Sequence, residues 1–172
     1  QDAIYAPDPY RSSDHDPVVI GLQLDTPRYL KESARTALMS TLPTGDRKTD
    51  RFIERALERI TESLDPAWWL DDMTLDPKKG SRVFDREHQA VIALSRVDLP
   101  VAVDAIDDLV EADRRLASVQ LELAIEAGGD SRDVRSAQRS LAKAGTYAAT
   151  GRPAKAVMEY KQAWKHAVKA LR

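Results

Sequence analysis

The chain has 172 residues, of which 42% are apolar and 31% charged, and its formal net charge at pH 7 is −2. This composition is typical of a well-charged helical protein, and the lack of cysteine excludes disulfides and thiolate metal sites. Aromatic residues make up only 6% of the chain, so we expect a core built from Leu, Ala, Val and Ile. No apolar run in the sequence approaches the length of a membrane span.

The first 25 residues contain the only constellation in the sequence that is typical of catalysis. Asp14 and His15 stand just before residues 18–22, an apolar run rich in β-branched residues that predicts a buried strand. A carboxylate beside a histidine can hold the imidazole in one tautomer and keep it basic near neutral pH. The competing interpretation is a turn, in which the side chains of Ser13 and Asp14 bond to nearby backbone groups.

Residues 10–22 carry a resemblance that extends beyond this pair. They are similar to the C-terminal signature Ser-Asp-His-x-Pro-Val of the endonuclease/exonuclease/phosphatase superfamily, the DNase I-like phosphodiesterases. Within it they look most like the secreted bacterial nucleases of the ExeM/NucH type. The matching positions are Ser13, Asp14, His15, Pro17 and Val18. The signature precedes an apolar strand of a two-sheet α/β sandwich, so the resemblance implies that residues 1–25 end such a domain.

The resemblance also implies a role for two residues and a cofactor. It implies that His15 contacts the scissile phosphate and takes part in activating the attacking water. Asp14 would help to hold a divalent cation, Mg²⁺ or in its place Mn²⁺ or Ca²⁺, or the water shell of that cation. The superfamily's other functional residues lie upstream of this signature, so we expect the motif to be inactive alone. The implied protein is a secreted hydrolase located outside the cell or in the cell envelope.

The predicted strand implies a partner as well. Its apolar side chains need sheet neighbours on both sides, because a free apolar strand is prone to aggregation. These side chains are Val18, Val19, Ile20, Leu22 and Leu24. We therefore expect another polypeptide to supply the remaining part of the nuclease domain.

The sequence pattern changes from strand-like to helical at Thr26. Thr26 is a capping residue and Pro27 suits the first helical position, which predicts a boundary between a catalytic segment, residues 1–25, and a helical domain, residues 26–172. Apolar residues at helical spacing predict helices over about residues 27–42, 47–64, 82–97, 100–127, 131–150 and 153–171. The predicted fold class is mainly α, with about six antiparallel helices in a bundle, preceded by one β-strand of a DNase I-like sandwich.

Two groups of apolar residues have predicted positions in this bundle. In the first helix, the residues expected to face the core are Leu30, Ala34, Ala37 and Leu38. Trp68 and Trp69 are adjacent, so their side chains point in different directions. We expect one of them in the core and the other only partly buried or at an interface.

Three aspartates in the loop after the tryptophans, Asp71, Asp72 and Asp76, allow two interpretations. Three carboxylates within six residues could bind calcium, although their spacing lacks the alternation and the terminal Glu of an EF-hand loop. The other interpretation is a solvated acidic loop whose carboxylates cap turns and helix ends.

The last two predicted helices, residues 131–171, resemble a single tetratricopeptide-like unit. Small and aromatic positions of that repeat are matched by Gly151, Ala156, Tyr160 and Ala163, whereas Pro153 stands at a position that is usually aromatic. The sequence holds no second copy of the unit. Because one unit cannot bury its own apolar face, we expect the hairpin to pack on the other helices.

The same hairpin is the only basic part of the chain, since residues 131–172 hold ten basic and two acidic residues, a net charge of +8. Helical spacing gathers the basic residues into one stripe on each helix. The first stripe is Arg132, Arg135, Arg139 and Lys143, and the second is Lys161, Lys165, Lys169 and Arg172. Together the stripes predict contact with a nucleic-acid phosphate backbone.

Two other interpretations of the stripes stay open. They are either ordinary solvated faces, or they lie against the acidic first half of the helix predicted over residues 100–127. Tyr147, Tyr160 and Trp164 stand near the stripes at helical spacing with Ala and Val, which favours core packing over contact with bases.

The sequence thus leaves two functions open. One is the C-terminal portion of a secreted, metal-dependent nuclease or phosphodiesterase, with Asp14 and His15 in an active site that another polypeptide segment completes. The alternative is a non-enzymatic helical interaction module that docks a partner protein or an anionic cell-surface polymer, with residues 1–25 as a tail. Replacement of His15 separates the two, because only the first function requires its imidazole.

Overall fold

The computed structural model describes residues 25–172 of the chain. The predicted strand over residues 18–22 therefore lies outside the described residues, and the DNase I-like part of the predicted fold class stays a prediction. Within the part that is described, the structure is mainly helical, as the sequence predicts.

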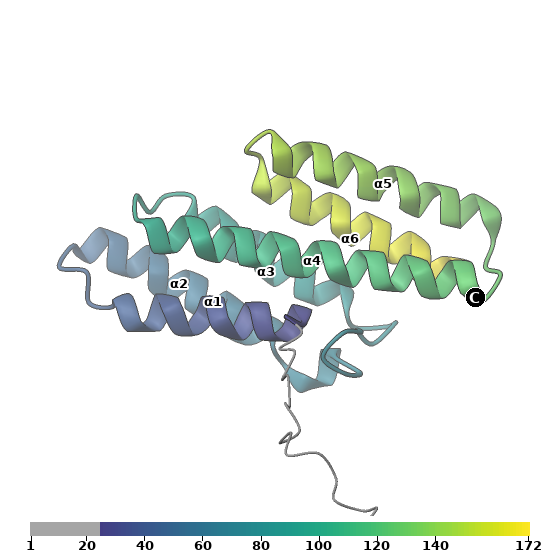
Figure 1. The fold of residues 1–172 in the computed structure, drawn as a ribbon. Coiled ribbons are helices and arrows are strands. Elements are labelled where there is room, and N and C mark those ends of the chain that lie inside the picture. The colour runs from purple at the N-terminus through teal and green to yellow at the C-terminus, as the bar shows by residue number, and fades with distance from the viewer. Residues whose placement is uncertain (1–24) are drawn as a thin grey trace, which may run out of the picture.

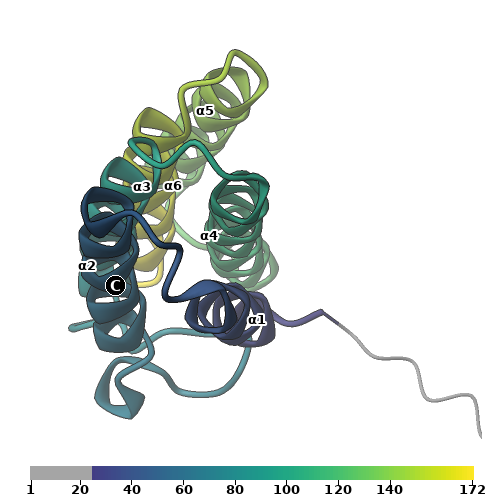
Figure 2. The same ribbon diagram turned by 90° about the vertical axis from the view of Figure 1, so that its left-hand side faces the viewer.

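Six α-helices alternate in direction along the chain and lie roughly side by side (Figure 1). The α-helices are α1 (Pro27–Thr41), α2 (Arg47–Ser63), α3 (Ser81–Leu94), α4 (Pro100–Glu126), α5 (Ser131–Ala149) and α6 (Pro153–Ala170), with a short 3-10 helix η1 (Pro66–Trp68) after α2. Seen along their axes, α2, α3 and α6 form one side of the bundle and α1 and α4 the other (Figure 2). Helix α5 packs outside them on α6 and α4. The predicted antiparallel helical bundle is confirmed.

The helix boundaries follow from local chemistry that the sequence shows. The Thr26 hydroxyl accepts the N–H of Tyr29 at the start of α1, and Pro27 fills the first helical position, where no N–H partner is needed. Gly128 (φ 68°) follows the end of α4, and Gly151 (φ 67°) turns the chain between α5 and α6. These signals explain why the observed boundaries differ from the predicted ones by only a few residues.

The buried face of α1 differs from the predicted one. Its buried residues are Pro27, Lys31, Ala34 and Leu38, whereas Leu30 is only partly buried and Ala37 is exposed. The prediction was wrong for Leu30 and Ala37, because the face of α1 that packs on the bundle includes the charged Lys31 and not these two apolar residues. Residues 27, 31, 34 and 38 are spaced by four, three and four, which is the spacing of a single helix face.

Both tryptophans of the turn after α2 belong to the core, each with 8% of its surface exposed. The expectation that one of them would be only partly buried was wrong. The indole N–H of Trp69 donates to the carbonyl of Ser63 at 2.8 Å, and Trp69 pairs with Leu75 in an antiparallel bridge. Trp68 ends the 3-10 helix η1 and Trp69 follows it with an extended backbone, so the alternation of a regular strand does not apply to these adjacent residues.

The α5–α6 hairpin packs on the rest of the bundle through α6, which contacts α3 and α4. Ala156, Tyr160 and Ala163 are buried in that contact. The prediction that the hairpin needs other helices to cover it is confirmed. Among residues 25–172, no helix is both long enough and apolar enough to cross a membrane.

Candidate functional site

The predicted catalytic pair, Asp14 and His15, lies outside the described residues, so its role stays a prediction. The structure shows where the chain enters the bundle after this pair. Asp25 lies beside α4, where the Arg115 guanidinium donates to its backbone carbonyl, and Thr26 then caps α1. Nine residues lie between His15 and Asp25 in the sequence.

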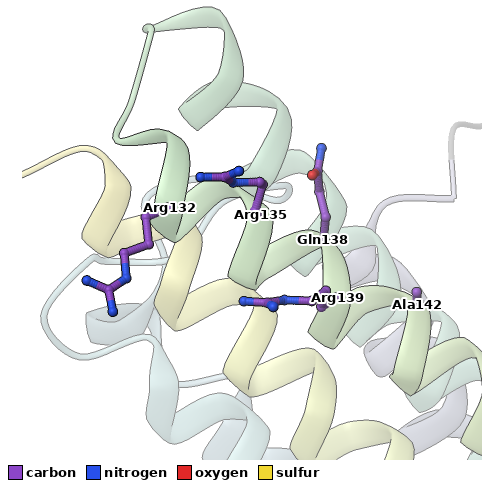
Figure 3. Close-up of a pocket in the computed structure, with 5 residues that line it drawn as sticks. All are labelled: Arg132, Arg135, Gln138, Arg139 and Ala142. Carbon is purple, nitrogen blue, oxygen red and sulfur yellow. The ribbon is translucent and has the colours of Figure 1, made fainter.

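Three arginines of the first basic stripe, Arg132, Arg135 and Arg139, form a row on the outer face of α5. All three are exposed, and their guanidinium groups project to one side of the helix (Figure 3). Together with Gln138 and Ala142 they line a shallow hollow of about 520 Å³. We refer to these three residues as the arginine row.

The arginine row keeps its charge free of carboxylate partners. The Arg135 side chain donates to the carbonyl of Ser131 at 3.2 Å, and Arg139 donates to the hydroxyl of Ser136 at 3.3 Å. No ion pair joins the row to an acidic residue within residues 25–172. Three cations that turn toward solvent on one helix face can contact a polyanion without first breaking an ion pair.

The lysines of the two stripes are arranged differently, because three of them already pair with carboxylates. Lys143 contacts Glu159 at 2.6 Å, Lys161 contacts Asp85 at 2.6 Å, and Lys169 contacts Asp133 at 3.0 Å. The side-chain hydrogen bond to Glu159 raises the pKa of Lys143. These partners lie on α6, α3 and α5, so the interpretation that the stripes lie against the acidic half of α4 was wrong for these lysines.

The aromatic residues near the stripes serve mainly the core. Tyr160 and Trp164 are each 2% exposed, and burial raises the pKa of the Tyr160 hydroxyl. Tyr147 is partly buried, with the ammonium groups of Lys143 and Lys155 at 5.7 and 5.8 Å from its ring centre. The prediction of core packing is confirmed for Tyr160 and Trp164, and neither ring offers a face on which a base could stack.

The acidic loop follows the capping interpretation. The Asp71 carboxylate accepts the N–H groups of Met73 and Thr74, and the Asp76 carboxylate accepts those of Lys78 and Lys79. The backbone hydrogen bonds from Lys79 and Lys78 lower the pKa of Asp76. Asp72 pairs with Arg28 at 3.7 Å. In the described part of the chain, no group of three acidic or histidine residues could hold a metal ion.

A cluster of charged residues that the sequence pattern did not predict lies at the centre of the bundle. The Lys31 ammonium on α1 lies 2.5 Å from Oε1 of Glu87 on α3 and 3.1 Å from Oδ1 of Asp113 on α4. All three side chains are 0% exposed. Within residues 25–172, Oε2 of Glu87 and Oδ2 of Asp113 have no hydrogen-bond partner. We refer to Lys31, Glu87 and Asp113 as the buried triad.

Burial sets the protonation of the buried triad. It raises the pKa of Asp113 well above its usual range, and the nearby Glu87 carboxylate raises it further. Burial alone would lower the pKa of Lys31, but attraction to Asp113 and Glu87 outweighs that effect and the pKa is raised. Lys31 offers one cation to two buried carboxyl groups, and the raised pKa of Asp113 favours a cluster with little net charge, which is the arrangement least costly to bury.

The buried triad has no access to solvent, so it joins three helices and does not contact a substrate. Its sequence signal is a charged residue at a core position of each helix. Lys31 lies between Pro27 and Ala34 on the buried face of α1. The other two follow the same rule, since Glu87 comes three residues after Phe84 and Asp113 four residues after Leu109. Both of those residues are buried.

The arginine row is the arrangement in the described residues that best fits a binding surface, whereas the buried triad lies in the core between three helices. Comparison with protein-family models, curated proteins and solved structures gave no match to this chain. The features that indicate a function are therefore residues 10–22 of the sequence and the exposed charges of the arginine row.

Proposed function

We propose that the chain is the C-terminal portion of a secreted, metal-dependent nuclease or phosphodiesterase. In this proposal residues 10–22 contribute the Ser-Asp-His motif to an active site that another polypeptide segment completes. The observation that carries the proposal is the unbroken similarity of residues 10–22 to the superfamily signature, from the Tyr-Arg-Ser lead through Asp14 and His15 to the apolar run.

The proposed chemistry uses the two polar residues of the motif. His15 contacts the scissile phosphate and accepts a proton from the attacking water, which an imidazole can do near neutral pH. Asp14 offers carboxylate oxygens, the ligand type that Mg²⁺, Mn²⁺ and Ca²⁺ prefer. The bound cation would supply positive charge to the phosphate oxygens.

The helical domain supports the proposal in two ways. Residues 26–172 have their own core and their own capping residue at Thr26, so they can follow a catalytic domain as a separate unit. The arginine row gives this unit three exposed cations. By counterion release they would hold the phosphate backbone of a nucleic acid and lengthen its stay near the active site.

The test of catalysis uses the assembled protein, with any co-purifying polypeptide identified by native mass spectrometry before and after denaturation. Cleavage of DNA, RNA and a small phosphodiester is measured with and without Mg²⁺. We expect His15→Ala to lower the rate by roughly 10²–10⁴-fold, the usual contribution of a general base. The matched control is His88→Ala, which removes a histidine of the helical domain. Cleavage that survives in His15→Ala would contradict the proposal.

A second candidate function, a non-enzymatic module that binds an anionic partner, is favoured by the free charges of the arginine row. Its test is the triple variant Arg132→Gln, Arg135→Gln and Arg139→Gln. The control removes three exposed arginines of α2, Arg47, Arg51 and Arg55. We expect only the first variant to weaken oligonucleotide binding and to reduce its salt dependence, by up to about three in the slope of log K against log salt.

The two tests separate the candidate functions. A protein that cleaves no phosphodiester but loses polyanion binding in the arginine-row variant is the interaction module. Cleavage that depends on His15 identifies the nuclease. Equal effects of the α5 and α2 variants on binding would show that the arginine row has no special role.

A further inference from the structure

A second, smaller hollow lies away from the arginine row, between the loop that leads into α3 and the last turns of α6. Its volume is about 270 Å³. Four basic residues line it, Lys78 from the loop and Lys165, Lys169 and Arg172 from the C-terminal end of the chain. We refer to this hollow and its four basic residues as the basic pocket.

The basic pocket carries an excess of positive charge. Three acidic residues lie near it, because Asp130 attracts the Lys169 ammonium in addition to the two carboxylates described next. The carboxylate of Asp133 pairs with Lys169 at 3.0 Å, and that of Asp76 accepts the backbone N–H groups of Lys78 and Lys79. The side-chain cations of Lys78, Lys165 and Arg172 have no carboxylate partner in residues 25–172. Cations brought together without partners repel one another, and a bound anion would relieve that repulsion.

The two walls of the basic pocket are held at a fixed distance by tight packing. Gly80 sits against the core so closely that a Cβ there would lie 2.4 Å from the Leu75 Cβ and 3.2 Å from the Trp164 ring. Trp164 and Val168, both buried, form the apolar floor between the loop and α6. The lysine of the loop and the cations of α6 therefore meet across a preformed hollow.

We propose that the basic pocket binds a phosphate group, either as free phosphate or as the terminal phosphate of a small phosphoester such as a nucleotide. A phosphomonoester carries about −1.5 to −2 charges at pH 7, which three or four cations can neutralise. The volume lies below the roughly 300–1,000 Å³ of pockets that enclose drug-sized ligands, so it suits a phosphate better than a whole nucleotide.

The residues that line the basic pocket all lie between positions 77 and 172, so this proposal goes beyond the proposed nuclease function and does not depend on His15. It also differs from the arginine row, because the row lies open along one helix and suits a polymer. The indole of Trp164 is buried, so the ligand is recognised through its phosphate and not by stacking of a base on the ring.

The experiment is calorimetric titration of the full chain with three probes: inorganic phosphate, adenosine 5′-monophosphate and adenosine. We expect the two phosphates to bind and adenosine not to bind. Lys78→Gln and Lys165→Gln should each weaken phosphate binding about tenfold, the usual effect of losing one charge-assisted hydrogen bond. The matched control is Lys79→Gln. It removes the same charge from the neighbouring residue, whose side chain does not line the pocket. It should change the affinity less than twofold.

The two phosphate probes identify the source of the ligand. Tighter binding of the nucleotide than of inorganic phosphate assigns the basic pocket to phosphoesters, and equal binding assigns it to free phosphate. Either result supports the proposal if Lys78→Gln weakens phosphate binding and Lys79→Gln does not. Three results would overturn the proposal. They are no heat of binding at millimolar phosphate, equal losses of phosphate affinity in Lys78→Gln and Lys79→Gln, and adenosine binding as tight as that of the nucleotide. Circular dichroism confirms that each variant is folded.

Discussion

The buried triad and the arginine row use charged side chains in opposite ways. In the triad, Lys31 contacts carboxylates from two other helices and is closed to solvent. In the row, three arginines come from one helix, contact only local hydroxyl and carbonyl groups, and stay exposed. The triad therefore connects elements that are far apart in the sequence, whereas the row leaves its charge available to another molecule.

Burial decides what a charge does in this bundle. A buried charge must be neutralised inside the protein, so the positions of Glu87 and Asp113 fix where α3 and α4 lie relative to Lys31 on α1. An exposed charge interacts weakly with its neighbours because water and salt screen it. Removing a member of the triad should therefore change stability, and removing a member of the row should change binding.

The largest expected effect is that of Lys31→Met, which leaves the Glu87 carboxylate buried without its cation. We expect a loss of about 3–5 kcal/mol in the free energy of unfolding, the usual cost of breaking a buried ion pair. Urea denaturation followed by circular dichroism measures it. The comparison variant is Arg135→Ala on the arginine row, for which we expect a change within about 0.5 kcal/mol.

A triple variant sharpens this prediction. Replacing Lys31, Glu87 and Asp113 together by Met, Met and Leu removes all the charges, so stability should return to within about 2 kcal/mol of the wild type. Similar losses of unfolding free energy in Lys31→Met and Arg135→Ala would show that burial does not distinguish the buried triad from the arginine row.

The next effect is a dependence of stability on pH that comes from Asp113. Its pKa in the folded protein is raised above the ordinary value of 3.8, so above pH 3.8 the unfolded chain releases a proton that the folded protein keeps. Because the folded state then binds more protons, the free energy of unfolding falls as pH rises, by up to about 1.4 kcal/mol per pH unit. This loss continues until the pH passes the raised pKa.

Asp113→Asn tests this dependence because asparagine does not titrate. We expect the wild type to lose stability relative to Asp113→Asn as the pH rises from about 4 to 7, the window that opens at the ordinary pKa of an aspartate. Urea unfolding at several pH values gives the difference, in which the other titrating groups largely cancel. Parallel curves for the two proteins would show that Asp113 is ionised in the fold.

The smallest effect is expected on the outer face of α5, at Gly145. A Cβ at this exposed position meets no atom within 4 Å. Alanine favours the helix over glycine, so Gly145→Ala should add about 0.5–1 kcal/mol to the free energy of unfolding. Gly80→Ala is the opposite case, because its Cβ would collide with Leu75, and it should destabilise the protein. Thermal unfolding compares the two, and stabilisation by both would contradict the packing described around Gly80.

Much of the helical domain could be predicted from the sequence because its signals are local. Thr26 and Pro27 define the start of α1, and the turn glycines separate the later helices. The buried triad escaped prediction because a lysine or a carboxylate ordinarily faces solvent. The predicted core face of α1 included Leu30 and Ala37 because it was chosen from apolar residues alone. The carboxylate partners of the lysines were not predicted either, because they are distant in the sequence. Asp85, for example, is 76 residues from Lys161.

The sequence by itself determined the helices of residues 26–172, the concentration of positive charge in the last 42 residues, and the motif around Asp14 and His15. Capping, apolar spacing and motif chemistry act within a few residues, so they can be recognised along the chain. Only the tertiary structure decided which charges are buried, which are paired and which stay free. Those outcomes depend on contacts such as that of Lys31 with Asp113, 82 residues apart, which form when the helices pack.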